Sequence, residues 1–485
     1  MIVVQSGVVA GIEGLLIDVE VDVRPGLPGF EIVGLPSKTV RESRERVRSA
    51  LRNSGFKFPA QKVIVNLAPA HYPKDGALFD LPIALGILAH QGILPTHVFD
   101  HAIFAGELSL NGNLKRVSGV LSLAELAARR NCQIVLPKEN EAEAALVVGD
   151  HCLLSPSLND LLEVLQGRRK RPSTVAPRGL ASQVFHPKEI KGQAQAKRAL
   201  ELAAHGGHHI MLIGPPGVGK TMLASTARYL LSPPTHEEIL VINKIHEAAS
   251  PGASRTSPLT ERPFRVPHHS ISQAALIGSK NGRPGEITLA HCGILLLDEF
   301  PEFNQGALQG LREPLDHKEV QISRAEHVLT FPADFWLIAT ANPCPCGYLG
   351  SSIRTCTCSG RDLNRYRRKL RGPLLDRFEM FTYLSPLSEA ELRQKTVPWP
   401  EKRTQGTKGH LSHKQNTRQA SRISPEALDF LHRAQESMEL SVRGFENTRR
   451  LAGTIASFDG ADVISPKHMG EALQYRFESY RDVFI

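Results

Sequence analysis

Hydrophobic and polar residues alternate in two stretches of the first third of the chain, residues 15–23 (LLIDVEVDV) and 62–67 (KVIVNL). A period of two predicts β-strands that bury one face. Residues 81–88 and 121–128 instead repeat their hydrophobic positions with helical spacing. We therefore predict a mixed α/β domain in this part of the chain.

Three short apolar runs follow, at residues 210–213 (IMLI), 294–297 (ILLL) and 335–340 (FWLIAT). Runs of this length and composition are typical of fully buried strands. Residues 319–325 and 327–331 resemble the two strands of a hairpin directly before the third run. A core of buried strands with a hairpin beside it is predicted here.

Residues 167–184 are rich in proline and basic side chains and lack hydrophobic periodicity, so we interpret them as a linker. A solvated linker is favoured over a binding site. The expected domains are 1–166, then a nucleotide-binding core at 185–384 and a helical domain at 385–485. Residues 398–424 are polar and unpatterned and predict a loop inside the last domain.

The chain has 485 residues, enough for about three domains, and its 41% hydrophobic and 22% charged residues are ordinary for a globular protein. A net charge of +9 favours an anionic partner, with nucleic acid as the first candidate. The amino terminus lacks the basic region of a secretory signal, and no apolar run is long enough to span a bilayer. We expect a cytoplasmic protein without a membrane partner.

One octapeptide, GPPGVGKT at residues 214–221, follows the apolar run 210–213 and matches the phosphate-binding loop GxxxxGK[ST] in full. Its glycines let backbone N–H groups converge on phosphates, while the lysine reaches the β and γ phosphates and the threonine binds Mg²⁺. The apolar run 294–297 ends in two carboxylates, Asp298 and Glu299, which indicates hydrolysis as well as binding. The predicted ATP-binding residues are Gly214, Pro215, Pro216, Gly217, Val218, Gly219, Lys220, Thr221 and Asp298.

With these motifs the chain resembles AAA+ ATPases of the helix-2-insert group. Within that group it resembles the Mg-chelatase-like YifB/ComM family. The resemblance covers nearly the whole chain and rests on VGLP (33–36), ESRERVR (42–48), VNLAP (65–69), DG (75–76), FDLP (79–82), PHH (267–269) and NPCPCG (342–347). It implies an AAA+ P-loop ATPase core with a helical lid. Members resembling ComM are hexameric, ATP-driven DNA helicases that promote branch migration in natural transformation.

The resemblance also implies roles for single residues. Asp298 would complete a Mg²⁺ site with Thr221, and Glu299 would polarise the attacking water. Asn342, at the end of the run 335–340, takes the sensor-1 position near the γ-phosphate; a simple turn residue is the alternative.

Two arginines are expected to act on phosphate. Arg377, in GPLLDRF (372–378), matches the arginine finger that one subunit supplies to its neighbour's nucleotide, and Arg443, in SVRG (441–444), matches sensor 2. A surface ion pair with Asp376 or Glu379 is the alternative for Arg377. An arginine finger implies a homo-oligomeric ring, for which the family expectation is a hexamer.

The central pore of such a ring would be lined by the hairpin and by the helix-2 insert. Basic residues there are candidates for contacts with DNA phosphates, and a solvated surface is the equal alternative for each: Lys280, Arg283, Lys318 and Arg324.

The first domain resembles the Lon-type proteolytic fold, through PKDG (73–76) and GELSLNG (106–112). In register, Leu78 replaces the nucleophilic serine and Leu121 replaces the lysine base, so we predict a proteolytically inactive domain. Nearby Lys74 and Ser118 are interpreted as structural. Four arginines at 41, 44, 46 and 48 could form a basic helix flank, but interleaved glutamates favour a self-neutralised surface.

Four of the seven cysteines form two CxC pairs, Cys344 with Cys346 and Cys356 with Cys358. Four thiolates suit tetrahedral Zn²⁺, and we favour zinc over free thiols although CxC is a less usual spacing than CxxC. The paired histidines His268 and His269 are expected to form a hydrogen-bonded turn instead.

By its resemblance to the YifB/ComM family we expect an ATP-driven motor on DNA that uses ATP and Mg²⁺, most simply a branch-migration helicase. A Mg-chelatase-like motor that remodels a protein partner is the main alternative. A protease is disfavoured by Leu78 and Leu121, and a non-hydrolysing scaffold by the intact Glu299, Asn342 and Arg377.

Overall fold

A computed structural model describes residues 1–147, 151–170, 188–250, 258–279, 281–324, 327–350, 354–369, 374–393, 398–400 and 422–476. Three parts of the chain lie outside these residues: most of the expected linker (171–184), residues 401–421 of the expected loop, and Lys280. The chain divides into two compact units. The first comprises residues 1–181 and 239–259, and the second comprises 182–238 and 260–485.

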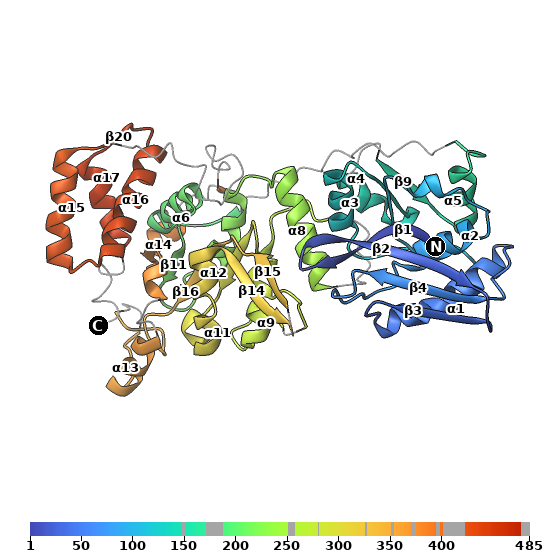
Figure 1. Ribbon diagram of the computed structural model, residues 1–485. Coiled ribbons are helices and arrows are strands. Elements are labelled where there is room, and N and C mark those ends of the chain that lie inside the picture. Colours follow the sequence, from blue (N-terminus) through green and yellow to red (C-terminus); the bar gives the residue numbers. More distant parts are fainter. Residues whose placement is uncertain are drawn as a thin grey trace. The chain divides into compact units, whose positions relative to one another are not determined.

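The first unit is built on a sheet of order β1-β2-β4-β3 and a smaller sheet of order β5-β8-β9 (Figure 1). The alternation at 15–23 becomes β2, where Ile17, Val19 and Val21 are fully buried. The predicted strand at 62–67 is β4, and the two predicted helices are α2 and α3; all four predictions are confirmed.

The strands of this unit are β1 (Ile2–Ala10), β2 (Glu13–Arg24), β3 (Gly29–Val33), β4 (Lys62–Ala68), β5 (Ala102–Phe104), β6 (Glu107–Leu108), β7 (Leu114–Lys115), β8 (Gln133–Pro137) and β9 (Cys152–Ser155). Its helices are α1 (Lys38–Asn53), α2 (Asp80–His90), α3 (Val120–Arg129), α4 (Glu141–Val147) and α5 (Leu158–Leu165).

Helix α8 (His236–Ala249) follows the nucleotide loop in sequence, yet most of it belongs to the first unit, because the boundary falls after Glu238. Ile239 packs with Leu121 and Leu146. Glu247 accepts a 2.5 Å hydrogen bond from the Gly119 N–H, at the start of α3. The first unit is therefore completed by a segment from the middle of the chain, although its place in the sequence predicts that it belongs to the nucleotide-binding core.

The second unit contains a five-stranded sheet in which every adjacent pair is parallel, in the order β12-β13-β16-β11-β17. The three predicted buried strands are β11, β13 and β16, and their side chains lie in the core with those of α6 and the lid helices. This is the expected P-loop ATPase core. The strands are β10 (Lys188–Glu189), β11 (Ile210–Ile213), β12 (Phe264–Arg265), β13 (Ile294–Leu297), β16 (Trp336–Ala341), β17 (Met380–Tyr383), β18 (Pro398–Trp399), β19 (Arg422–Ile423) and β20 (Val463–Ile464).

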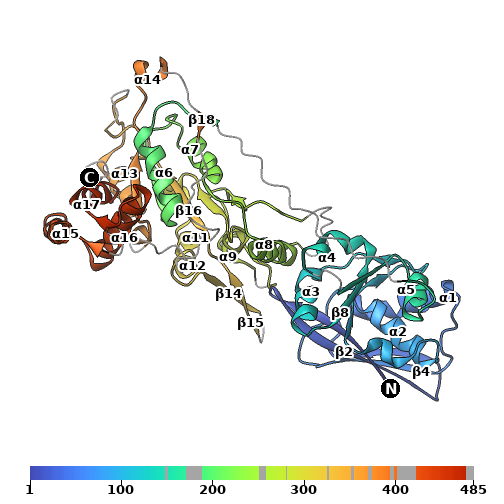
Figure 2. The same cartoon turned by 90° about the horizontal axis from the view of Figure 1, so that it is seen from above.

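The predicted hairpin is also confirmed, as the antiparallel pair β14 (Glu319–Arg324) and β15 (His327–Pro332) (Figure 2). The helices of the core are α6 (Ala194–Gly206), α7 (Lys220–Thr226), α9 (Gln273–Ile277), α10 (Glu286–Leu289), α11 (Gln305–Gln309), α12 (Arg312–His317) and α13 (Gly360–Lys369). The lid contains α14 (Glu389–Arg393), α15 (Pro425–Met438), α16 (Val442–Phe458) and α17 (Pro466–Gln474).

Candidate nucleotide-binding site

Three neighbouring strands of the second unit end at the same edge of the sheet. Strand β16 lies between β11 and β13, with Ala341 opposite Ile213 and Ala339 opposite Leu297. The residues that follow these strands are Gly214, Asn342 and Asp298. Because parallel strands share their carboxyl edge, three segments far apart in sequence meet there, where such sheets bind ligands.

The phosphate loop follows β11 and leads into α7. Gly217 and Gly219 adopt left-handed backbone conformations with φ of 82° and 88°. Other residues rarely tolerate this conformation, so the glycines are required for the loop to turn its N–H groups inward. The local geometry is that of an anion cradle.

Lys220 lies at the centre of the site. Its Nζ donates to Gly214 O at 2.7 Å, Pro215 O at 2.8 Å and Asn342 Oδ1 at 2.9 Å. Burial lowers the pKa of this ammonium group to about 8. The predicted phosphate-binding lysine and the predicted sensor-1 amide are therefore in direct contact.

Thr221 and Asp298 also meet, as predicted from the motifs. The Thr221 hydroxyl lies 3.0 Å from both carboxylate oxygens of Asp298. Hydroxyl and carboxylate oxygens are the ligands that Mg²⁺ prefers, usually beside water and phosphate oxygens. These two residues fit a magnesium site.

Thr340, on β16, was not singled out from the sequence. Its buried hydroxyl donates to Asp298 Oδ1 at 2.6 Å and accepts from the Glu299 N–H at 3.0 Å. Glu299 has a left-handed backbone with φ of 56°, which is unusual for a residue other than glycine and is often found at functional sites. Thr340 thus fixes the two carboxylate residues relative to each other.

The histidine pair divides into two roles. His268 Nδ1 lies 2.8 Å from Ser270 Oγ, which confirms the expected hydrogen-bonded turn. His269 instead approaches Glu299, with Nδ1 3.5 Å from Oε2. This contact between the insert and the carboxylate was missed because nothing in the sequence spacing links the two residues.

The two predicted phosphate-binding arginines meet at one carboxylate, Asp316 on α12. Arg377 contacts both Asp316 oxygens, and Arg443 Nη2 lies 3.3 Å from Asp316 Oδ1. Partial burial opposes ionisation of Asp316, but the hydrogen bond and charge of Arg377, with Arg443, lower its pKa overall. Arg377 thus forms an ion pair with Asp316, and not the surface pair with Asp376 or Glu379 that was the alternative.

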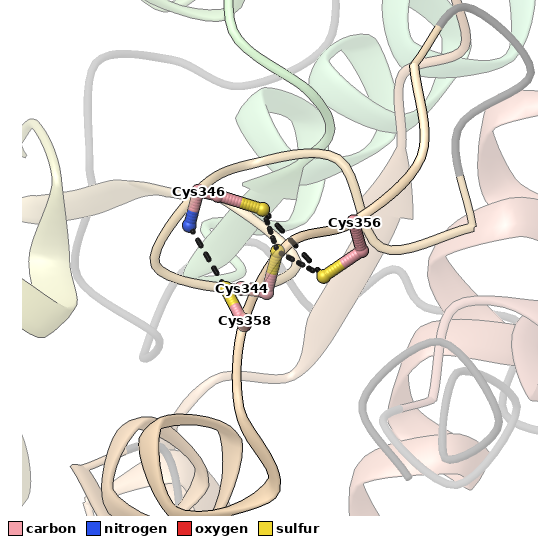
Figure 3. Close-up of side chains that lie close together, drawn as sticks. All are labelled: Cys344, Cys346, Cys356 and Cys358. Atoms are coloured by element: carbon pink, nitrogen blue, oxygen red, sulfur yellow. Dashed lines mark hydrogen bonds between the residues drawn. The ribbon is translucent and has the colours of Figure 1, made fainter.

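The four clustered cysteines lie together, with all four sulfur atoms within 4.8 Å of one another (Figure 3). Cys344 Sγ is 3.3 Å from Cys346 Sγ and 3.7 Å from Cys356 Sγ. Sulfur atoms bound to one tetrahedral zinc at about 2.3 Å would be about 3.8 Å apart. The residues present therefore fit a Cys₄ zinc site.

Backbone groups support the same arrangement. The N–H of Cys346 donates to Cys358 Sγ, and that of Leu349 donates to Cys344 Sγ, both at 3.3 Å. Burial opposes ionisation of Cys346, yet hydrogen bonds from the backbone of Tyr348 and Thr357 bring its thiol pKa down to about 6. Burial and hydrogen bonds with neighbouring thiols instead raise the pKa of Cys344 and Cys358. Backbone donors stabilise thiolates, the form that binds metal.

The cysteine loop also contacts the nucleotide site. A side chain at Gly347 would come within 2.5 Å of Pro216 in the phosphate loop. Tyr366 of α13 donates a 2.8 Å hydrogen bond to the backbone oxygen of Asn342, two residues before Cys344. The cysteine loop thus contacts the phosphate loop, and the chain just before it is held by α13.

In the first unit, the positions of the missing Lon-type residues are core positions. Leu78 and Leu121 are 8% and 1% exposed, so neither side chain lines an open site. Lys74 is buried, with its Nζ bonded to Pro69 O, as expected of a structural residue. Arg46 pairs with buried Asp80, and Arg48 with Glu45 and the Phe58 ring, which supports the interpretation of α1 as self-neutralised.

The candidate DNA-contacting residues are only partly described. Lys318 precedes β14 and pairs with Asp334 at 3.0 Å, so its charge is partly neutralised within the chain. Arg283 is exposed. Lys280 and the side chain of Arg324 lie outside the described residues, as does Arg371. No described helix combines the length and apolar character needed to cross a membrane.

Comparison with known proteins gives matches along almost the entire chain. Three family models match, described as magnesium chelatase subunit ChlI (187–392), subunit ChlI of Mg-chelatase (19–140) and magnesium chelatase subunit ChlI C-terminal (394–476). YifB of Escherichia coli is 38% identical over 98% of this chain and 96% of its own length. Competence protein ComM of Haemophilus influenzae is 38% identical over 98% and 97%. A short match, 42% identical over 54 residues and 11% of each chain, is to a lon protease homolog of Thermoplasma volcanium.

Proposed function

The chain belongs to the YifB/ComM family of magnesium-chelatase-like AAA+ ATPases, and on that premise we propose that it hydrolyses ATP to move DNA. The observation that carries the proposal is the convergence of Lys220, Asn342 and Asp298 at one sheet edge. Each comes from a different motif, and together they supply the phosphate, sensor and metal contacts of an ATPase.

The proposed roles follow the geometry. Residues 214–221 bind the triphosphate, with Lys220 on the β and γ phosphates, and Thr221 and Asp298 hold Mg²⁺, which neutralises phosphate charge when bound. Glu299 takes the proton of the attacking water, while Asn342 orients the water and the γ-phosphate. Thr340 keeps Asp298 and Glu299 in place through its two hydrogen bonds.

We propose that the site is completed between subunits of a homo-oligomer, a hexamer by family resemblance. Arg377 and Arg443 contact Asp316, whereas Lys220 and Thr221 contact Asn342 and Asp298. Within this chain the two arginines thus share a contact at Asp316, a residue outside the motifs that meet at the phosphate loop. Both would serve the nucleotide of a neighbouring subunit, where a guanidinium stabilises transition-state charge.

DNA is the proposed substrate of the motor, with ComM-like branch migration during natural transformation as its specific activity. The similarity to a competence protein and the net charge of +9 support this assignment. The β14–β15 hairpin and the insert with exposed Arg283 would face the strand in the ring. We place this activity in the cytoplasm.

We further propose that Cys344, Cys346, Cys356 and Cys358 bind a structural zinc ion. The supporting observations are the four sulfur atoms within 4.8 Å and the N–H donors to two of them. Because the loop contacts Pro216, and Tyr366 contacts Asn342, the metal would hold sensor 1 and the phosphate loop in register.

The proposed domains are a proteolytically inactive Lon-like domain at 1–166, a linker at 167–184, the ATPase core at 185–384 and the lid at 385–485. Segment 239–259 joins the Lon-like domain in space. Since Leu78 and Leu121 are packed in its core, this domain would serve binding or assembly.

A second candidate is a motor that remodels a protein partner, as the magnesium chelatase name of the matching family models suggests. It would use the same ATP site. The two functions differ in what stimulates hydrolysis.

The test uses purified protein at modest salt in two assays. One measures migration of a DNA junction with and without ATP, and the other measures ATPase activity with and without single-stranded or branched DNA. We expect ATP-dependent migration and faster hydrolysis when DNA is present, and neither with Glu299→Gln. Robust ATPase activity that neither single-stranded nor branched DNA changes would favour a protein partner and contradict the DNA assignment.

A further inference from the structure

Asp316 lies where three segments of the second unit meet. It is near the end of α12, two residues before Lys318 and three before β14. Arg377 reaches it from the short helical turn Leu375–Arg377 before β17, and Arg443 reaches it from the first turn of α16 in the lid. One carboxylate thus receives a guanidinium from the core and another from the lid.

The two contacts differ in exposure. The Arg377 side chain is 12% exposed and the Arg443 side chain 47%, beside an Asp316 side chain that is 34% exposed. Arg377 pairs through both Nε and Nη2, a two-point geometry that fixes the plane of a guanidinium. Long side chains held this way lose little further freedom when they bind phosphate.

Charge gives a second reason for the carboxylate. Two guanidinium groups beside each other repel, and a shared negative charge offsets that repulsion. Because the pKa of Asp316 is lowered, the carboxylate is ionised at neutral pH. Without it, the two arginines would separate.

The lid does not depend on Asp316 for its attachment. Two residues beyond Arg377, Glu379 pairs with Arg450 of α16 and lies 2.6 Å from Nδ1 of buried His208. His208 Nε2 is in turn 2.7 Å from Thr454 Oγ1, also on α16. Helix α16 is therefore anchored independently of the contact with Asp316.

We propose that Asp316 is the positioning residue of the ATPase, holding Arg377 and Arg443 together in the orientation in which they meet a neighbouring subunit's phosphates. The inference rests on the proposed function, since it assumes that these arginines act in ATP hydrolysis. Asp316 acts only through them and does not itself contact nucleotide.

The test compares Asp316→Asn with Asp316→Glu, and uses Glu313→Gln as the matched control. Glu313 is exposed on the same short helix, so its change removes the same charge one turn away. For each variant we would measure kcat, ATP affinity, assembly and thermal melting in the full chain. We expect Asp316→Asn to lower kcat by about 10-fold or more with ATP affinity and melting unchanged. Asp316→Glu should recover much of the rate, and Glu313→Gln should resemble the wild type.

A triple variant separates positioning from folding. If Asp316 acts only through the two arginines, adding Asp316→Asn to the variant Arg377→Ala/Arg443→Ala should slow ATP hydrolysis no further. A further loss in the triple variant would overturn the proposal, as would an unchanged kcat in Asp316→Asn. A fall in melting temperature or assembly that Asp316→Glu does not restore would assign Asp316 a structural role and overturn it too.

Other results would contradict the proposed ATPase function itself and not the role of Asp316. In that case the wild type would lack ATPase activity, or Arg377→Ala would hydrolyse ATP at the wild-type rate. Either result removes the role that Asp316 is proposed to support, before any Asp316 variant is measured.

Discussion

The hydroxyl of Thr340 donates a 2.6 Å hydrogen bond to Asp298, and the same oxygen accepts the N–H of Glu299. One buried side chain on β16 therefore holds both carboxylate residues that follow β13. Thr340→Val removes the hydroxyl with almost no change in shape. We expect a loss of about 1–3 kcal/mol in stability, because the Asp298 and Glu299 groups lose their partner.

The same change should lower kcat about 10-fold and raise the Mg²⁺ concentration needed for half-maximal ATPase activity, since Asp298 is no longer held. The control is Thr382→Val on β17 of the same sheet. Thr382 is also buried, but its hydroxyl has no hydrogen-bond partner within the described part of the chain, so this variant should be neutral or slightly stabilised. Equal effects of the two substitutions would contradict the role of Thr340.

ATP affinity should depend on pH through Lys220. Burial places the pKa of its ammonium group at about 8 in the free protein, and the negative phosphates of ATP would raise it in the complex. Binding above that pH must therefore take up a proton, and affinity should fall by up to about 10-fold per pH unit. Titration calorimetry between about pH 7 and 9.5, in buffers of different ionisation enthalpy, measures both effects.

Lys220→Met provides the comparison for this measurement. It should bind ATP weakly, and its affinity should not change over the same pH range, because the titrating group is gone. A flat profile for the wild type would show that Lys220 stays protonated and would contradict the assigned pKa.

Zinc should purify with the protein at about one equivalent per chain. Cys356→Ser should lose the metal and lower both the melting temperature and ATP affinity, because the cysteine loop contacts Pro216 in the phosphate loop. Cys152→Ser is the control for metal content and ATP affinity, since this buried thiol lies on β9 in the first unit and is not one of the four clustered cysteines. Metal analysis that finds no zinc, with all four clustered thiols titrating freely, would contradict the site.

Much of this fold could be predicted from the sequence because its signals are local. The alternation at 15–23, the apolar runs before Gly214 and Asp298, and the hairpin at 319–331 each form the expected element. The octapeptide 214–221 predicts its own geometry, since residues other than glycine rarely tolerate the backbone at positions 217 and 219.

Contacts between distant segments could not be predicted in the same way. Thr340 is one of several polar residues near the end of a strand, and only the register of β13 against β16 brings it to Asp298. Asp316 and His269 belong to segments without a motif that links them to Arg377 or Glu299. Likewise, α8 follows the phosphate loop in sequence, yet from Ile239 onward it belongs to the first unit, where Ile239 packs with Leu121, more than one hundred positions earlier in the chain.

The central claim, that each ATP site is completed by a neighbouring subunit, is tested most directly by mixing two inactive variants. Arg377→Ala keeps its own phosphate loop and Glu299, whereas Glu299→Gln keeps its own arginines. In a mixed ring, the ATP site of an Arg377→Ala subunit keeps its own Glu299. When its neighbour is a Glu299→Gln subunit, that neighbour supplies Arg377, so this site is complete. An equimolar mixture should therefore regain up to about a quarter of wild-type ATPase activity, the share of such interfaces expected by chance. A mixture of assembled proteins that is no more active than its two components would contradict the claim.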